Sequence, residues 1–245
     1  MKESLYLVFD LETVGLPWEY FDESRQEYLL RGATTQEDRD KKIRELALSP
    51  LCAQIVCIGI SIIRAGEEQW QMEKEGALVL DEKMADGEQR RETLESGLNL
   101  VYSNEAGLIN GFWKMLLHYP SIHLVSFNGR GFDAPFLMLR SAVHHIRPVR
   151  NLMGGTKWNY SLHTDLADEL SYFGYQSSGP LRRFNFDFYA RSFGITSPKG
   201  EGIDGSKVGE FYEAGRLPEI AEYCMRDVRA TWELYLYWKK YLSFS

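Results

Sequence analysis

The stretch LYLVFDLET, residues 5–13, is the part of the sequence that decides the fold. Its first five residues, Leu5 to Phe9, are apolar or aromatic without alternation, which is typical of a β-strand covered on both faces. The run stops at two carboxylates, Asp10 and Glu12, where we expect the strand to end at a charged rim. Because side chains two positions apart lie on the same face of a strand, Asp10 and Glu12 are predicted to project together from its carboxyl end.

Two carboxylates held this close repel each other, and a protein keeps such a pair where a cation neutralises it. Mg²⁺ and Mn²⁺ are the simplest candidates, because both prefer carboxylate oxygens. On this stretch alone, the alternative is a strand that ends in a polar turn and carries no chemistry. The rest of the chain decides between the two interpretations.

The composition is that of an ordinary globular protein. The chain has 245 residues, of which 44% are hydrophobic and 26% charged, enough for one large α/β domain or two small ones. The longest apolar run, residues 55–63, is too short to span a bilayer, and the N-terminus leads into a strand without a signal-peptide segment. We therefore expect a cytoplasmic protein without a membrane partner. The three cysteines have no C-x-x-C spacing, which argues against a disulfide framework or a zinc site.

Charge is distributed unevenly along the chain. The formal net charge is −7, but residues 1–120 carry a balance of −9 and residues 130–207 a balance of +3. The positive segment also holds the aromatic residues Trp158, Tyr160, Tyr172, Phe173, Tyr175, Phe184, Phe186, Phe188 and Tyr189. Basic residues interleaved with aromatic ones suit a single-stranded nucleic acid, although most of these aromatic side chains are expected in the core.

The first half of the chain predicts an interrupted sheet. Residues 14–50 form a polar excursion with an exposed helix at 37–48, which we treat as an insertion near the active face. Residues 52–64 and 67–79 predict a strand hairpin. Residues 81–96 are dense in charge and predict a loop or a solvated helix.

The second acidic position follows a strand. Residues 104–118 have helical periodicity with Asn104 as the cap, and residues 122–127 predict a buried strand. That strand leads through a glycine-containing turn to Asp133, after which 134–143 is helical. If the strand is parallel to the first, Asp133 lies near Asp10 and Glu12.

Three further segments precede the last helix. Residues 161–166 predict a short strand ending in Asp165, which is expected to cap a helix rather than to bind a ligand. Residues 181–193 resemble a helix, and 194–205 predict a glycine-punctuated loop. A short helix then starts with Ser206 as its cap and stops at Gly215.

The third acidic position lies on the last helix, predicted for residues 217–241 with Pro218 in its first turn. Asp227 falls within the apolar seam of this helix, and Tyr223 lies one turn earlier on the same face. A carboxylate on a buried face is costly unless something binds it. A salt bridge to a core arginine is the structural alternative.

Together, D-x-E near the N-terminus, N-x(3)-F-D in the middle and Y-x(3)-D on the last helix resemble the three motifs of the DEDD 3′–5′ exonucleases, tyrosine subclass. The segments 194–200, 203–208 and 223–224 are similar to those of stand-alone bacterial proteins related to the proofreading domain of family B DNA polymerases. The resemblance implies a ribonuclease H-like α/β fold, with a mixed central sheet flanked by helices. We expect residues 1–245 to form a single such domain with a helical insertion near 14–50. The histidine subclass is excluded, because the histidine nearest before Asp227 is His163.

The resemblance also implies roles for individual residues. Two ions of Mg²⁺ or Mn²⁺ would be held by Asp10, Glu12, Asp133 and Asp227, while Tyr223 would orient the attacking water. The substrate contacts carried over with the motifs are Leu11, Thr13, Asn128 and Phe132, and candidate phosphate contacts are Lys199 and Lys207. Two features depart from the pattern of the family. Arg130 adds a charge inside the second motif, and a long excursion follows Thr13.

The expected partner is a single-stranded nucleic acid with a free 3′ end, DNA more than RNA. The expected reaction releases nucleoside 5′-monophosphates, and no polymerase domain is expected in the chain. An exoribonuclease is an alternative, because recognition of the 2′-hydroxyl depends on groove geometry. A catalytically silent binding module is a second alternative, against which the four intact acids argue.

Overall fold

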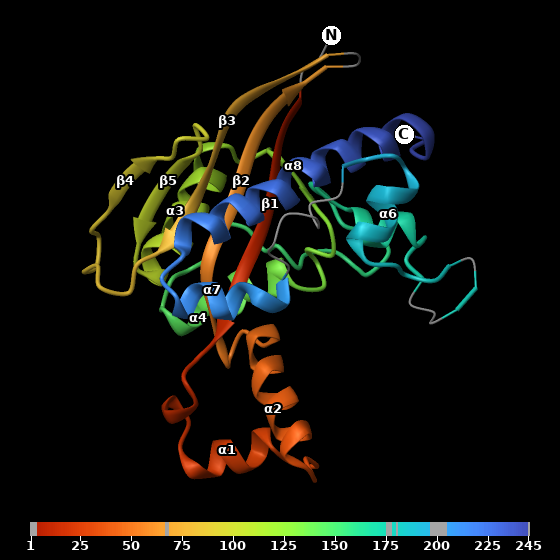
Figure 1. Cartoon of the computed structure of the whole chain (residues 1–245). Coiled ribbons are helices and arrows are strands. Elements are labelled where there is room, and N and C mark those ends of the chain that lie inside the picture. Colours follow the sequence, from red (N-terminus) through yellow and green to blue (C-terminus); the bar gives the residue numbers. More distant parts are fainter. Residues whose placement is uncertain (1–3, 67–68, 175–177, 180, 197–204, 245) are drawn as a thin grey trace.

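The computed structural model describes residues 4–66, 69–174, 178–179, 181–196 and 205–244. Within these residues, seven strands form one mixed sheet in the order β4-β5-β3-β2-β1-β6-β7. Helices cover both faces of the sheet (Figure 1). The α/β class expected from the sequence is therefore confirmed.

Strand β1 (Ser4–Gly15) lies near the middle of the sheet. It pairs along its whole length with β2 (Ala53–Ala65), antiparallel, and through residues 6–8 with β6 (His123–Ser126), parallel. The prediction that the strand ends at its two acids was wrong, since β2 continues the pairing as far as Gly15 across a register shift after Glu12. β6 runs parallel to β1, which is the direction that the predicted position of Asp133 near Asp10 and Glu12 requires.

The outer strands extend the sheet on both sides. The predicted hairpin is confirmed by β3 (Trp70–Leu80), antiparallel to β2, and β7 (His163–Asp165) lies parallel to β6. Neither β4 (Arg90–Thr93) nor β5 (Asn99–Ser103) was predicted. β4 forms the edge of the sheet, where charged side chains remain in water and discourage further pairing, so its composition resembles that of a loop.

Two long helices pack on opposite faces. Strand alternation turns Phe9 toward α3 (Glu105–His118), where its ring lies 5.4 Å from that of Phe112. The next residue, Asp10, faces α8 (Leu217–Tyr241), which crosses the other face. Asn104 caps α3 as predicted by accepting a hydrogen bond from the Gly107 amide. The first turn of α8 contains the expected proline.

The remaining helices connect these layers. They are α4 (Asp133–Val143), α5 (Leu166–Leu170), α6 (Phe186–Ser192), the 3₁₀ turn η3 (Gly205–Lys207) and α7 (Val208–Glu213). The helix predicted from residue 181 starts only at 186, because the Asn185 side chain caps α6 by accepting from the Phe188 amide. The residue at the N-cap of α7 is Lys207, and the side chain of Ser206 lies outside the described part.

The excursion at 14–50 contains η1 (Trp18–Tyr20), α1 (Glu23–Leu29), α2 (Gln36–Glu45) and η2 (Leu46–Leu48). The helix expected at 37–48 is confirmed, with a capping box at Thr35 and a 3₁₀ turn at its end. α1 was missed, although Asp22 caps it. In Figure 1 these helices project beyond the end of the sheet at which β1 finishes.

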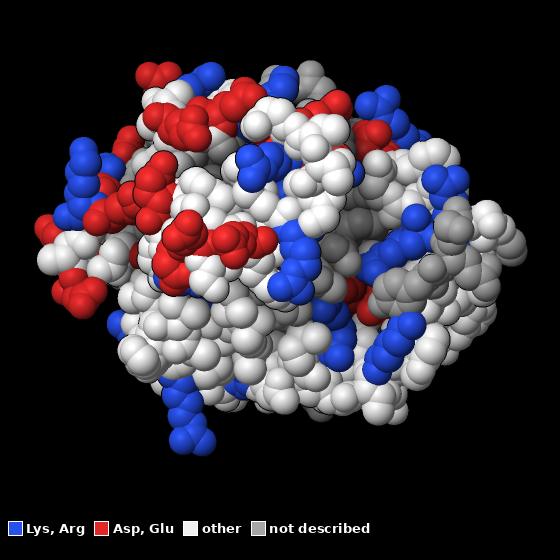
Figure 2. Space-filling view, turned by 90° about the horizontal axis from the view of Figure 1, so that it is seen from below, with Lys and Arg blue, Asp and Glu red and all other residues white. Residues whose placement is uncertain are grey.

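The surface at that end is divided by charge. In Figure 2, acidic side chains gather on one half of the face, and lysine and arginine side chains on the other, where they border a hollow with acidic side chains at its floor. Among the described residues, no helix has the length and apolar character needed to cross a bilayer.

Candidate active site

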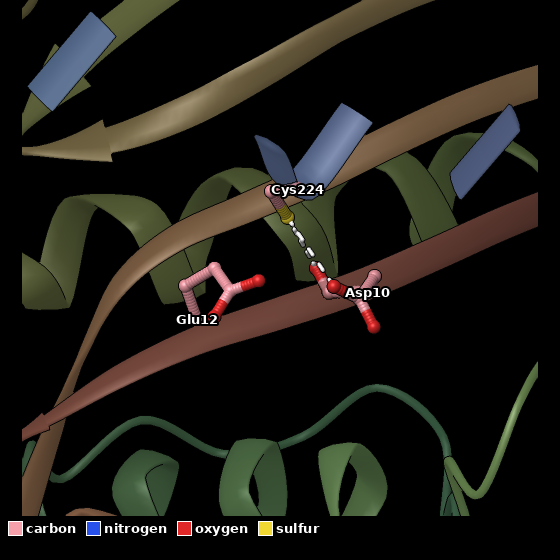
Figure 3. A group of neighbouring side chains, drawn as sticks. All are labelled: Asp10, Glu12 and Cys224. Carbon is pink, nitrogen blue, oxygen red and sulfur yellow. Dashed lines mark hydrogen bonds between the residues drawn. The ribbon is translucent and has the colours of Figure 1, made fainter. Parts of the chain in front are cut away.

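Asp10 and Glu12 lie on one side of β1, beneath α8 (Figure 3). Glu12 is 8% exposed and Asp10 is half-buried. A thiol of α8 closes this side of the pair, since Cys224 Sγ lies 3.4 Å from the Asp10 carbonyl oxygen and 3.6 Å from Asp10 Oδ2. The alternation predicted from the sequence therefore holds, and the two carboxylates project together.

Asp133 joins this pair from the start of α4. Its Oδ1 accepts a hydrogen bond of 2.9 Å from the Leu11 amide, the residue between the two acids of β1. The side chain is 3% exposed. This contact follows from the parallel pairing of β1 and β6, because the turn after β6 then reaches the same region of the sheet as Asp10 and Glu12.

A second carboxylate fixes the turn that leads to Asp133. Asp165 is fully buried and accepts hydrogen bonds from the amides of Asn128 and Arg130, both at 2.8 Å, and from Ala167 in α5 at 3.0 Å. The prediction that Asp165 caps a helix is confirmed. It also holds the second motif in place, which the sequence could not show.

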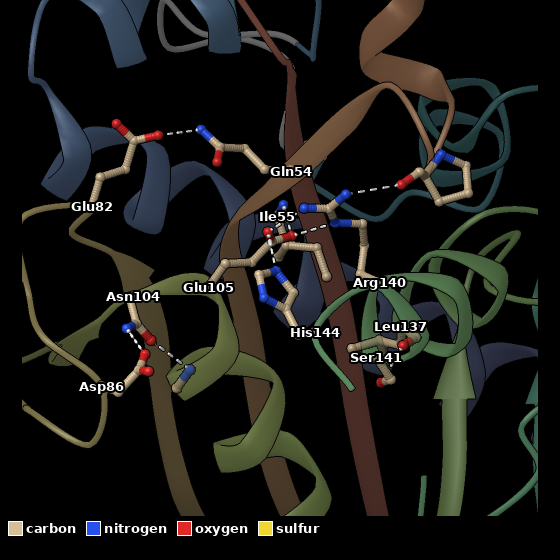
Figure 4. A network of polar contacts seen from close by, with 12 residues as sticks. Gln54, Ile55, Glu82, Asp86, Asn104, Glu105, Leu137, Arg140, Ser141 and His144 are labelled. Carbon is tan, nitrogen blue, oxygen red and sulfur yellow. Dashed lines mark hydrogen bonds and ion pairs between the residues drawn. The ribbon is translucent and has the colours of Figure 1, made fainter. Parts of the chain in front are cut away.

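The other end of α4 is held by a buried ion network (Figure 4). Arg140 donates to both carboxylate oxygens of Glu105, at 2.8 and 2.5 Å, and Glu105 also bonds His144 and the Ile55 amide. Burial raises the pKa of Glu105, but these hydrogen bonds outweigh it, so the pKa is lowered overall. The carboxylate therefore stays charged and ties α3, α4 and β2 together.

Helix α8 supplies the remaining two residues. Tyr223 is 5% exposed, and its hydroxyl hydrogen-bonds the carboxylate of Asp227, one turn along the same face. Burial, followed by the charges of Asp227, Glu12 and Asp10, raises the pKa of Tyr223 far above its usual value. The phenol is therefore protonated and acts as a hydrogen-bond donor toward the acids.

Burial and the neighbouring acids raise the pKa values of Asp10, Glu12 and Asp133. Burial is the largest cause of the raised pKa of Asp10, and repulsion from Asp133, Asp227 and Glu12 follows. Burial likewise raises the pKa of Glu12, with Asp227, Cys57 and Asp133 adding to it. The pKa of Asp133 is raised to about 7 by burial, against the hydrogen bond from Leu11. Carboxylates in this arrangement need a positive partner to be charged together.

This donor set fits a hard divalent cation. Oxygen atoms of Asp10 and Glu12 and the sulfur of Cys224 lie within 4.8 Å of one another. Burial raises the pKa of the Cys224 thiol, and Cys57, Asp10 and Glu12 raise it further. The sulfur therefore keeps its proton and donates a hydrogen bond to Asp10. The carboxylate oxygens are then the atoms of this cluster that could hold a cation, and they are the type that Mg²⁺ and Mn²⁺ prefer.

Three of the predicted substrate contacts surround a small pocket. Leu11, Thr13 and Phe132 line a cavity of about 290 Å³ beside Glu12. The hydroxyl of Thr13 donates to the Ala47 carbonyl oxygen at 2.7 Å, so the excursion forms one wall of this pocket. Phe132 packs on Phe136, with ring centres 4.7 Å apart.

The other predicted contacts are placed differently. Asn128 has a positive φ of 63°, and its side-chain oxygen accepts a 2.7 Å hydrogen bond from Arg183, a residue the sequence gave no reason to select. Lys207 is exposed on η3, and Lys199 lies outside the described residues. Cys224 was also missed as part of the site. Its position next to Tyr223 on the buried seam was the available signal.

A family model described as "Predicted 3'-5' exonuclease related to the exonuclease domain of PolB" matches residues 81–243, which include Asp133, Tyr223 and Asp227. A search of curated proteins gave no match.

Among solved structures, the chain resembles the family B DNA polymerase of the hyperthermophilic archaeon Pyrobaculum calidifontis. The TM-score is 0.57 at 18% identity, and the match covers 96% of this chain and 24% of the polymerase. At this identity the likeness shows the fold alone, and it supports the expected ribonuclease H-like arrangement.

Proposed function

The chain belongs to the family of predicted 3′–5′ exonucleases related to the exonuclease domain of PolB, and from this premise we propose that it is a metal-dependent 3′–5′ exonuclease of the tyrosine subclass. It would remove nucleoside 5′-monophosphates from the 3′ end of a single strand, DNA in preference to RNA.

One observation carries the proposal. Acids from three distant segments, Asp10 with Glu12, Asp133 and Asp227, lie close together, and burial with this crowding raises the pKa values of Asp10, Glu12 and Asp133. A protein without bound cations gains nothing from this arrangement, since each buried charge costs stability. Phosphodiester cleavage supplies a reason, because the reaction needs cations held by several carboxylates.

We propose that these four acids hold two ions of Mg²⁺ or Mn²⁺. Bound there, the ions would offset the negative charge of the carboxylates and act as Lewis acids on the scissile phosphate. The Leu11 amide fixes the orientation of Asp133 through its hydrogen bond, so this ligand is positioned before any cation binds.

Tyr223 is proposed to position the attacking water. Its raised pKa makes it a poor base, so its hydroxyl would act as a hydrogen-bonding group held by Asp227. The attack would break the bond to the penultimate nucleotide and leave a 3′-hydroxyl on the shortened strand.

The terminal nucleotide is proposed to enter between Leu11, Thr13 and Phe132. The small pocket there shares Thr13 and Ala47 with a larger one of about 700 Å³, formed between the excursion and α7. Lys41 and Arg44 line the larger pocket together with Glu45 and Glu213, so the two basic side chains are the groups there that would contact the next phosphates. The proposed roles of Asn128, Lys199 and Lys207 rest on the motif resemblance.

The test is a cleavage assay with 5′-labelled single-stranded DNA and a matched RNA, each with Mg²⁺ or Mn²⁺. Stepwise shortening from the 3′ end is expected, faster on DNA, and absent in an Asp10→Ala/Glu12→Ala variant. An Asp187→Ala variant serves as the control, because Asp187 pairs with Arg191 on α6 and belongs to neither pocket. Activity that survives the double substitution, or intact substrates with both metals, would refute the proposal.

A further inference from the structure

A third pocket lies at the opposite end of β1 from the acids. It has a volume of about 720 Å³ and is formed by the start of β1, residues 118–123 and the last turns of α8. Tyr6, one of its walls, precedes Asp10 by four residues, or about 13 Å along a strand. Its volume falls in the range of sites that hold a small organic ligand.

The lining of this pocket is positive. Among the described residues that line it there is no aspartate or glutamate, although the chain as a whole is acidic. Arg64 and Lys239 contribute positive charge, and His118 and His123 add two imidazoles. Arg64 also pairs with Glu73, outside the pocket, so Lys239 is the cation less engaged with acids.

Lys239 is exposed and held over an aromatic surface. Its Nζ donates to the Tyr6 hydroxyl at 3.2 Å and lies 5.5 and 5.9 Å from the ring centres of Tyr6 and Tyr235. Within the described part of the chain it has no carboxylate within ion-pair distance. An anion that enters the pocket would therefore meet a positioned ammonium group that does not first have to leave a competing carboxylate.

The lowered pKa of His123 is consistent with positive charge around this pocket. His123 is hydrogen-bonded to Thr164 at 2.8 Å in the wall of the pocket. Burial, with the charges of Lys239 and Arg150, lowers the pKa of His123 to about 4. The guanidinium of Arg150 donates to the carbonyl oxygens of Pro120 and Ile122, so it also fixes the loop that forms this wall.

The rest of the wall is aromatic. Tyr235 lies between Tyr6 and Trp238, with ring centres 5.3 and 5.8 Å away. Tyr119 lines the pocket and packs edge-on against His118. Flat rings next to a cation suit a ligand that is itself flat and negatively charged.

We propose that this pocket binds a nucleotide, with its base against the Tyr6, Tyr235 and Trp238 wall and its phosphate at Lys239. The choice of a nucleotide among flat anions rests on the proposed function, whose substrate and product are both nucleotides. The ligand would be a free nucleoside monophosphate or one nucleotide of a strand, since both present the same base and phosphate.

Calorimetric titration of the full chain with AMP and dAMP, in the presence of a chelator, tests the proposal without requiring activity. Lys239→Gln is expected to weaken binding about tenfold or more, because it removes a charged hydrogen-bond donor. Lys240→Gln is the matched control, since Lys240 lies next in sequence but does not line this pocket. Adenosine lacks the phosphate and ribose 5-phosphate lacks the base, so both should bind more weakly than AMP.

The same titration in the Asp10→Ala/Glu12→Ala background separates this pocket from the acid site. Retained binding that still depends on Lys239 supports the proposal even if no exonuclease activity is found. Displacement of AMP by oligothymidylate would identify a strand as the source of the nucleotide, and failure to displace it would identify the free monophosphate. Absence of binding, or equal affinity in Lys239→Gln and Lys240→Gln, would overturn the proposal.

Discussion

At the scale of a single residue, the burial of Asp10 among other acids lowers the stability of the fold at neutral pH. Its pKa is raised by burial and by neighbouring acids, so the folded state disfavours its charged form. A carboxyl group with a raised pKa stabilises the fold at low pH, and this contribution is lost as pH rises through the folded-state value. At pH 8, in a chelator, Asp10→Asn is therefore expected to raise the unfolding free energy.

Thermal unfolding with and without Mn²⁺ checks this prediction. Mn²⁺ should stabilise the wild type but not Asp10→Asn, which should also lose cleavage activity. Asp22→Asn is the contrasting substitution, because exposed Asp22 caps α1 and its pKa is lowered by hydrogen bonds from Arg25. It should not stabilise the chain. A destabilised Asp10→Asn, or equal responses of both proteins to Mn²⁺, would contradict the interpretation.

Substitution of Tyr223 distinguishes a role in positioning the attacking water from a role in cation binding. Tyr223→Phe keeps the ring and removes only the hydroxyl that bonds Asp227. We expect kcat to fall about 10²-fold, in the range for groups that assist proton transfer or orientation. The stabilisation by Mn²⁺ should remain, because all four carboxylates are intact. Loss of both activity and the Mn²⁺ response would show that the hydroxyl supports cation binding instead.

Residue types and their spacing predicted the four acids and Tyr223, because buried carboxylates at element junctions stand out in a sequence. The contacts among them were less accessible. Neither the Arg183–Asn128 hydrogen bond nor the thiol of Cys224 over Asp10 follows from local pattern, since each joins segments separated by many residues. The catalytic roles themselves stay predictions.

At the scale of elements, the seam between α8 and the sheet depends on a glycine. Gly59 in β2 faces α8, and a Cβ atom there would lie 2.8 Å from Cys224 Sγ and 3.0 Å from Val228 Cγ2. Gly59→Ala is expected to cost about 1–3 kcal/mol of unfolding free energy through overpacking. It should also lower activity, because α8 carries Tyr223 and Asp227.

Chemical denaturation and cleavage assays measure the two effects of Gly59→Ala. The control for stability is Gly209→Ala in α7, where no atom lies near an added Cβ and alanine favours a helix. It should leave stability unchanged or raise it slightly. If α8 can shift without an energetic cost, Gly59→Ala will be as stable as Gly209→Ala and as active as the wild type, which would contradict the prediction.

Hydrophobic patterns predicted β1, β2, β3, β6, α3 and α8, whose buried faces leave a periodic trace in the sequence. β4 was missed, because an exposed edge strand has the composition of a loop. β5 lies between β4 and β3 and is mostly buried, but its five residues are too few to show a periodic pattern. The false start of the helix at 181–193 has a different cause. Phe184 packs on Phe188 of α6 although it precedes the helix, and an apolar residue just outside a helix cannot be distinguished by pattern from one on the helix face.

At the scale of the whole molecule, the buried His163 and the half-buried His123 make stability dependent on pH. Burial and nearby positive groups lower the pKa of His163 to about 3, and its Nε2 lies 2.7 Å from Ser126 Oγ. The unfolded chain takes up a proton near pH 6.5, whereas the fold resists it, so stability falls as pH drops from about 6.5 toward 3. Between pH 8 and pH 5 His163 should cost about 2 kcal/mol, and His123 acts in the same direction.

Denaturant midpoints at pH 8, 6.5 and 5 test this expectation. His163→Gln keeps a nitrogen near Ser126 and cannot titrate, so its stability should fall less between pH 8 and 5. Parallel curves for the variant and the wild type would place the acid sensitivity elsewhere.

The separation of Asp10 from Cys224 by 214 residues has a consequence for how the protein is made. Contacts between distant residues close late and slow folding, because the chain loses much entropy before it gains them. During synthesis β1 leaves the ribosome well before α8, which carries Tyr223 and Asp227. Under the proposed function, a nascent chain has an incomplete acid cluster and cannot cut nucleic acid, including its own messenger, until α8 docks.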